Sequence, residues 1–165
     1  MELLGPTLEE VFTRWADRQL DVATVALVGI EMVSGLHAAV DVSVVQVDRL
    51  EALHREGFVH RDVKPENFLI ANKAHCKVVC IDFGLAKRFL DPQTKAHLPY
   101  NDRRSLTGTA RYASVNAHMG VEPSRRDDLI SAGHCEDLGF DQAPDYNYLR
   151  SLLSSVVADK KTLPV

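Results

Sequence analysis

Residues 58–84 constrain the fold of this chain more than any other stretch, and they read FVHRDVKPENFLIANKAHCKVVCIDFG. Two polar clusters, HRDVKPEN and DFG, each stand beside an apolar run. The runs FLI and KVVCI predict two short strands joined by a polar turn at Asn72 and Lys73. Such a hairpin would bring four polar side chains close together: Asp62, Lys64, Asn67 and Asp82.

These four side chains are of the kinds that a magnesium–polyphosphate site needs. Mg²⁺ takes carboxylate and amide oxygens, which Asp62, Asn67 and Asp82 can supply. Lys64 would bring positive charge to a phosphoryl group. A charged surface hairpin also explains the acidic residues, but it does not explain the order His-Arg-Asp, Lys, Asn and then Asp-Phe-Gly.

Together the two motifs resemble the catalytic loop and the metal-binding motif of eukaryotic protein kinases. Downstream, LTGTARYAS and SRRDDL surround Ser114-Val115-Asn116, which stands where most kinases have Ala-Pro-Glu. That replacement and its surroundings resemble the casein kinase I family. The opening MELLGPTLE is similar to the family's hinge segment, and the resemblance covers approximately residues 1–33, 48–134 and 140–153.

The resemblance implies an α+β, mainly α, protein kinase-like fold with short β-hairpins around the catalytic loop. It corresponds to the hinge and the C-terminal lobe only, so residues 1–153 are expected to form a partial kinase domain and 154–165 a C-terminal tail. The glycine-rich loop and the ATP-binding lysine of the small lobe would precede Met1 and are expected to be absent.

The resemblance also assigns catalytic and metal-binding roles. Asp62 orients the substrate hydroxyl and accepts its proton, and Lys64 offers an ammonium to the transferring phosphoryl group. Asn67 and Asp82 hold the Mg²⁺ that bridges the phosphates of ATP. Thr109 is expected to hydrogen-bond to Asp62 and Lys64.

Further residues are assigned to binding and support. The backbone near Leu4 would meet the adenine ring, with Leu69 and Ile81 as the apolar floor beneath it. Arg111 corresponds to a basic residue that reads an acidic or phosphorylated group on the substrate, although pairing with a nearby acid is the alternative. Asp128 is expected to accept hydrogen bonds from the backbone of the His60-Arg61 turn.

Two departures interrupt the resemblance. A segment at about residues 34–47 is inserted before RLEALH, and its valines at 40, 42 and 44 alternate with smaller or polar residues. A period of two and branched valines disfavour a helix. The segment is therefore predicted to loop out, or to be sequence foreign to the folded product. A block of several tens of residues is missing near residues 134–138.

Short-range signals predict the local structure elsewhere. Thr7 is predicted to cap a helix with acidic residues in its first turn. Along that helix runs an apolar stripe that core packing explains best: Leu8, Val11, Phe12 and Trp15. Asp21 is predicted to cap a second helix that continues through Val33. Residues 91–106 are polar and predict a loop, which the resemblance makes the activation loop.

Composition limits the partners and the compartment. The chain has 165 residues and a net charge of −4, which gives no whole-chain case for binding nucleic acid. No apolar run is long enough to cross a membrane. Three cysteines without metal-ligand spacing favour a reduced cytoplasmic and/or nuclear setting. The sequence leaves the oligomeric state open.

We therefore expect a serine/threonine protein kinase of casein kinase I type. It would transfer the γ-phosphoryl group of ATP to Ser or Thr of protein substrates with acidic or phosphorylated sites, using Mg²⁺. Without a small lobe, the chain is expected to be weakly active or inactive. The alternatives are a non-catalytic, pseudokinase-like module that binds peptides and a non-functional fragment.

Overall fold

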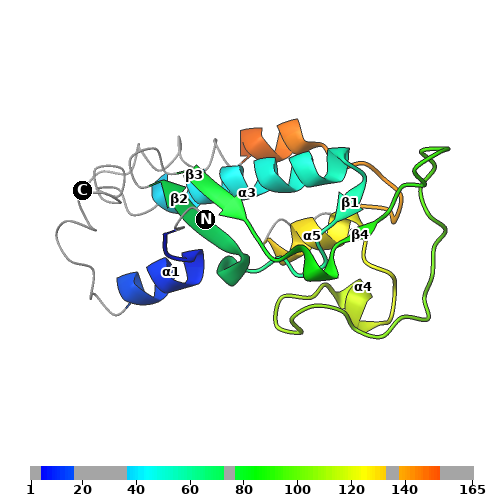
Figure 1. Cartoon of the computed structure of the whole chain (residues 1–165), viewed down its shortest axis with the longest axis horizontal. Helices are drawn as coiled ribbons and strands as arrows, with labels where there is room; N and C mark the ends of the chain where they lie inside the picture. The colour runs from blue at the N-terminus through cyan, green and yellow to red at the C-terminus, as the bar shows by residue number, and fades with distance from the viewer. Residues whose placement is uncertain (1–4, 17–36, 73–76, 133–137, 153–165) are drawn as a thin grey trace. The chain divides into compact units, whose positions relative to one another are not determined.

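The computed structural model describes residues 5–16, 37–72, 77–132 and 138–152 (Figure 1). The chain divides into two compact units, and each is described by itself. The first unit contains Met1–Gln46, Pro65–Ile81 and Asn147–Val165, and the second contains Val47–Lys64 and Asp82–Tyr146. The motif stretch is thus divided, with residues 58–64 and 82–84 in the second unit and residues 65–81 in the first.

Helix α1, Leu8–Ala16, opens the first unit, and a capping box fixes its start. The hydroxyl of Thr7 accepts a hydrogen bond from the backbone N–H of Glu10 at 3.1 Å, and the Glu10 carboxylate accepts one from the N–H of Thr7 at 3.1 Å. This reciprocal pair satisfies two backbone donors that a helix end leaves open. The predicted cap at Thr7 is confirmed, and Leu8 and Val11 are buried as the stripe requires.

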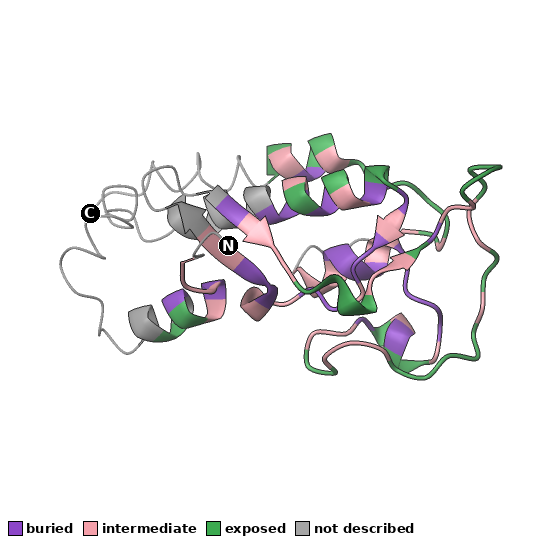
Figure 2. Ribbon diagram, viewed as in Figure 1, coloured by how far each residue is buried: buried purple, intermediate pink, exposed green. Residues whose placement is uncertain are grey.

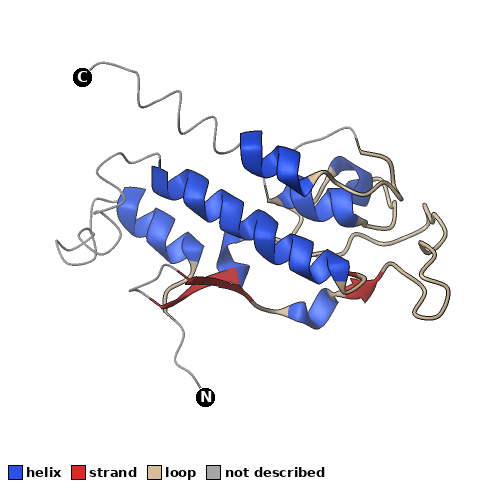
Figure 3. Cartoon of the chain, turned by 90° about the horizontal axis from the view of Figure 1, so that it is seen from above, coloured by secondary structure: helices blue, strands red, loops and turns tan. Residues whose placement is uncertain are grey.

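A two-stranded antiparallel sheet follows the 3₁₀ turn η1, Pro65–Asn67. Strand β2, Phe68–Asn72, pairs with β3, Lys77–Cys80, with Phe68 opposite Cys80. These are the two strands that the apolar runs predict, and Figure 3 shows them in red. The chain before α1 is fastened to the same sheet, because Gly5 N–H donates to the carbonyl of Ile70 at 2.9 Å.

Helix α3, His37–Arg55, is continuous through the segment that was expected to loop out, so that prediction is wrong for residues 37–47. The alternation of valines was the misleading signal. Val40, Val44 and Val47 also stand at i, i+4 and i+7, the spacing of one helical face. Placing a valine in a helix costs roughly a few tenths of a kcal/mol. Tertiary context routinely overrides so small a penalty.

The second unit contains another two-stranded antiparallel sheet. Strand β1, Phe58–Val59, pairs with β4, Lys87–Arg88, placing Val59 opposite Lys87 (Figure 1). The 3₁₀ turn η2, Phe83–Leu85, precedes β4. Two helices complete the named elements of this unit, α4 at Val115–His118 and α5 at Arg125–Ser131. A further helix covers residues 146–152, across the division between the units.

The core of the second unit lies around α5 and the C-terminal half of α3. Val47 and Leu50 of α3 and Leu129 of α5 are completely buried. Val59 of β1 and Val63 are also buried. Figure 2 colours the buried residues of the described chain purple. The segment with the HRD motif is therefore flanked by two anchored apolar residues, which fixes the path of the polar residues between them.

Residues 89–114 contain neither a helix nor a regular strand, and they include the loop predicted at 91–106 (Figure 3). An isolated bridge joins Leu90 to His97. Within the turn that it closes, the Asp91 carboxylate accepts hydrogen bonds from the backbone N–H groups of Gln93 and Thr94. The Asp91 side chain thus orders this part of the loop, because it binds backbone N–H groups that regular secondary structure would otherwise use.

Several predictions concern residues outside the described part of the chain. The helix expected from Asp21 through Val33, the residue Leu4 and the side chain of Trp15 are among them. In the described part, no helix is both long and apolar enough to span a membrane.

Truncating Leu50 to alanine should lower the free energy of unfolding by about 2–5 kcal/mol, because a fully buried side chain leaves a cavity. Arg49→Ala is the matched control, because Arg49 is the neighbour of Leu50 in the same helix and is exposed. Urea denaturation of both variants measures the difference. Equal losses would show that Leu50 is not part of a packed core.

Candidate active site

Two residues, Lys64 and Thr109, bind the carboxylate of Asp62. Its Oδ2 accepts a hydrogen bond from Lys64 Nζ at 2.8 Å, and its Oδ1 accepts one from the backbone N–H of Thr109 at 2.8 Å. Lys64 Nζ also donates to Thr109 Oγ1 at 2.9 Å. The contacts predicted for Thr109 are confirmed. Asp62 is buried and ion-paired with Lys64, so the carboxylate and the ammonium lie in fixed relation to each other.

Gly108 allows the chain around Thr109 to approach Asp62 this closely. Its φ is +89°, a left-handed conformation that side chains rarely adopt. A Cβ at this position would also collide with the carbonyl oxygen of Arg61. Glycine therefore fits here for two independent reasons.

Asp128 holds the turn that leads to Asp62. Its Oδ2 accepts a hydrogen bond from His60 N–H at 2.7 Å, and its Oδ1 accepts one from Arg61 N–H at 2.8 Å, as predicted. His54 Nε2 lies 2.9 Å from the same Oδ2. Arg61 has a left-handed φ of 69°, which is strained for a non-glycine residue, so these bonds support an unfavourable backbone.

The neighbouring Asp127 fixes the helix that carries Asp128. It closes a capping box, in which its carboxylate accepts the N–H of Ser124 at 2.7 Å. Its other oxygen lies 2.5 Å from Ser114 Oγ, and that hydroxyl also caps α4. Both acids of SRRDDL are buried, and both serve to place the loops around Asp62.

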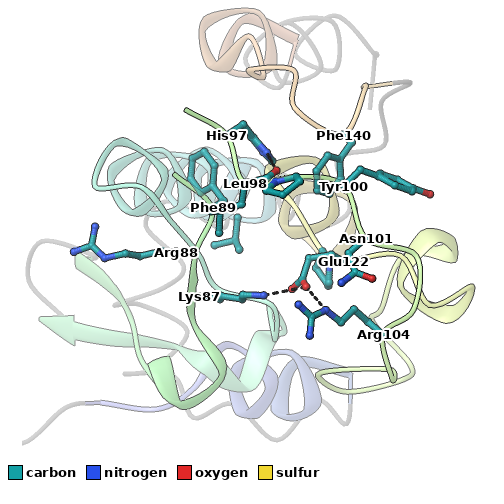
Figure 4. Close-up of a pocket in the computed structure, with 13 residues that line it drawn as sticks. Lys87, Arg88, Phe89, His97, Leu98, Tyr100, Asn101, Arg104, Glu122 and Phe140 are labelled. Atoms are coloured by element: carbon teal, nitrogen blue, oxygen red, sulfur yellow. Dashed lines mark hydrogen bonds and ion pairs between the residues drawn. The ribbon is translucent and has the colours of Figure 1, made fainter. Parts of the chain in front are cut away.

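Glu122 is a buried acid that collects three basic side chains from distant segments, and sequence reasoning missed its role. Its carboxylate lies 3.4 Å from Arg61, 2.9 Å from Lys87 and 2.5 Å from Arg104. Figure 4 shows Lys87 and Arg104 pointing toward it. In the sequence, Glu122 is simply an acid within the stretch that resembles the family. No residue near it in the sequence indicates its three partners.

Both carboxylates are held in their ionised form. Burial alone would raise the pKa of Asp62, but hydrogen bonds from Lys64 and Thr109 and the charge of Lys64 bring it below its ordinary value. Burial likewise opposes ionisation of Glu122, yet Lys87, Arg104 and Arg61 lower its pKa. At neutral pH, Asp62 is therefore an acceptor of hydrogen bonds.

Asp82 lies in the second unit in a left-handed conformation, with φ of 62°, and caps the turn η2. It is exposed, and its Oδ1 accepts the N–H of Gly84 at 3.4 Å. The ring of Phe83 lies 5.3 Å from that of His60, which joins the DFG segment to the HRD turn. An exposed carboxylate next to this turn is a suitable oxygen ligand for Mg²⁺.

Asn67, Leu69 and Ile81 belong to the first unit. Asn67 is buried, and its carbonyl accepts the N–H of Ile81 at 2.9 Å. The hairpin thus brings these three predicted residues into one unit, whereas Asp62, Lys64 and Asp82 lie in the other. In the described part of the chain, no three His, Cys, Asp or Glu side chains converge on a metal site.

Arg111 is exposed, and its guanidinium lies over the ring of Tyr112, 5.4 Å from the ring centre. Among the described residues it forms no ion pair, so the alternative of pairing with a nearby acid gains no support there. A guanidinium stacked on a tyrosine is held in place while its outer edge faces solvent.

A pocket of about 210 Å³ lies in the second unit beside Glu122 (Figure 4). Its wall is aromatic, because Phe140 packs 4.9 Å from His97 and 5.1 Å from Tyr100, measured between ring centres. The ion pairs of Glu122 lie at its other side. At this pocket, the loop that follows β4 packs against the segment around Phe140.

Comparison with known proteins gives this site its family. Residues 36–133, more than half of the chain, match the protein kinase domain family. The chain belongs to the protein kinase family. It is also 34% identical to Casein kinase I homolog 3 of Schizosaccharomyces pombe over an alignment that is 213 positions long, gaps included, and covers 95% of this chain. The chain spans 45% of the length of that relative.

The chain is thus casein kinase I-like, as the motifs indicate. Its helices and two small sheets agree with a protein kinase-like fold. The matched residues contain Asp62, Lys64, Thr109 and Asp82, and they also contain Glu122.

Replacing Glu122 by glutamine should destabilise the folded chain near neutral pH by about 2 kcal/mol, because three cations lose their anion. The native pKa lies below its ordinary value of 4.5. The stabilising contribution is therefore present above that pH and is lost as the pH falls through the native pKa. Urea denaturation at about pH 7 and about pH 3.5 should show the difference between the two proteins shrinking in acid.

Glu56→Gln is the control for this experiment, because Glu56 is exposed. A difference between Glu122→Gln and the parent protein that stays constant with pH would contradict the ionic role of Glu122.

Proposed function

We propose that this chain acts as a serine/threonine protein kinase of casein kinase I type. It transfers the γ-phosphoryl group of ATP to Ser or Thr in protein substrates, at a low rate for this chain alone. The chain corresponds to the hinge and the C-terminal lobe of such a kinase. The observation that carries the proposal is the cluster of Asp62, Lys64 and Thr109 in the second unit.

The cluster suits phosphoryl transfer for a physical reason. A transferring phosphoryl group needs a carboxylate that orients the attacking hydroxyl and a cation close to the charge that builds up. Asp62 is buried and ionised at neutral pH, and Lys64 lies 2.8 Å from it. Thr109 bonds to both groups and fixes their geometry, which is a requirement for efficient transfer.

Asn67 and Asp82 would hold the Mg²⁺ that neutralises charge on the nucleotide. Mg²⁺ in kinase sites needs only one or two protein oxygens, because water and phosphate supply the rest. Leu69 and Ile81, with the backbone near Leu4, would contact the adenine ring.

The test is phosphate transfer by the purified chain with Mg-ATP and an acidic Ser/Thr peptide. Substituting Asp62→Asn should reduce the rate by roughly a hundredfold or more, to background, since the hydroxyl loses its proton acceptor. Asp91→Asn serves as control, because that carboxylate only closes a loop turn. Equal rates for the parent chain and Asp62→Asn would contradict the proposal.

Arg111 supports a finer statement about substrates and also a second candidate function. We propose that its exposed guanidinium binds an acidic or phosphorylated group on the substrate peptide, as a charge-assisted hydrogen bond would allow. If the chain binds such peptides without transferring phosphate, it is a non-catalytic peptide-binding module. The same observation on Arg111 favours both functions, and only transfer distinguishes them.

Arg111→Ala should weaken the binding of a phosphorylated peptide roughly tenfold and leave an unphosphorylated, neutral peptide unaffected. Arg103→Ala is the matched control, because Arg103 is exposed in the preceding loop. Fluorescence anisotropy with the two peptides measures both effects. Equal weakening by both substitutions would show a general effect of charge and no specific site.

A further inference from the structure

The phenol of Tyr146 lies against the histidine that supports Asp128. Its hydroxyl is 2.5 Å from His54 Nδ1, and the other nitrogen of that ring, Nε2, is 2.9 Å from Asp128 Oδ2. His54 is buried, and the ring of Phe89 packs against it edge-on with 6.3 Å between ring centres. Both polar atoms of the imidazole therefore have a partner, and neither faces solvent.

The direction of these hydrogen bonds follows from the acceptor. The Asp128 carboxylate already accepts two backbone N–H groups, those of His60 and Arg61, and a carboxylate can only accept. His54 Nε2 must then carry a proton and donate it. In the neutral ring Nδ1 is left with a lone pair, which needs a donor. Burial raises the pKa of Tyr146, so its hydroxyl keeps its proton and can donate.

We propose that Tyr146 is a positioning residue for the catalytic turn: its hydroxyl donates to His54 Nδ1, fixes the ring with its proton on Nε2 and so orients Asp128. The chain of contacts runs from Tyr146 through His54 and Asp128 to the backbone of His60 and Arg61. Asp62 directly follows that turn. The catalytic part of this statement rests on the proposed kinase function.

The first test is spectroscopic and needs no activity. Nitrogen-15 NMR of the full chain should show His54 protonated at Nε2, with Nδ1 as a hydrogen-bonded acceptor. In Tyr146→Phe the Nδ1 signal should move toward that of an unbonded ring nitrogen. Tyr148→Phe, which removes an exposed hydroxyl only two residues away, should leave the signal unchanged. A proton on Nδ1 in the parent chain overturns the proposal, even if Tyr146→Phe does not fold.

The second test measures the turn and the reaction. Tyr146→Phe should lower hydrogen-exchange protection at the amides of His60 and Arg61 roughly three- to tenfold, as expected for one lost hydrogen bond. It should lower kcat for phosphate transfer by a similar factor and leave KM for ATP unchanged. Unchanged protection and kcat overturn the proposal. If the parent chain transfers no phosphate, the kinase function falls, and the NMR and exchange results still decide whether Tyr146 positions the turn.

Discussion

The carboxylate of Asp128 is the group on which the arrangement of the second unit depends. It is almost completely buried, and burial of an ionised carboxylate is costly unless donors surround it. The backbone N–H groups of His60 and Arg61 and the ring of His54 are those donors. Because Asp62 follows at once, fixing two backbone amides also fixes the next carboxylate in the chain.

Arg61 shows how much support this turn requires. Its left-handed backbone costs on the order of 1–3 kcal/mol. The N–H of Arg61 is held by Asp128, its Nε donates to the carbonyl of Leu85 at 2.7 Å, and its Nη1 reaches Glu122. Three bonds on one residue offset the strain and point the following Asp62 toward Lys64 and Thr109.

The sequence allowed good predictions wherever local geometry is encoded in a short, ordered motif. The contacts of Thr109 and Asp128 followed from the resemblance, and the cap at Thr7 and the β2–β3 hairpin followed from local signals. Helix α3 was partly mispredicted because alternating valines fit two periods, and the segment is helical.

Glu122, His54 and Tyr146 were beyond such reasoning for a different reason. Glu122 meets Arg61 across 61 positions of sequence, and His54 meets Tyr146 across 92. No local pattern specifies which distant base or hydroxyl will face a buried acid or imidazole. Those choices are made by the packing of the whole unit, where each buried polar atom must find a partner.

Charge and backbone act together where Glu122 meets the loop after β4. Glu122 N–H donates to the carbonyl of Asn101 at 2.7 Å, and Arg104 N–H donates to that of Gly120 at 2.9 Å. The side chains of Glu122 and Arg104 then pair across the same two segments. Since the Glu122 carboxylate also holds Arg61 and Lys87, the loop and the His60-Arg61 turn share one anion.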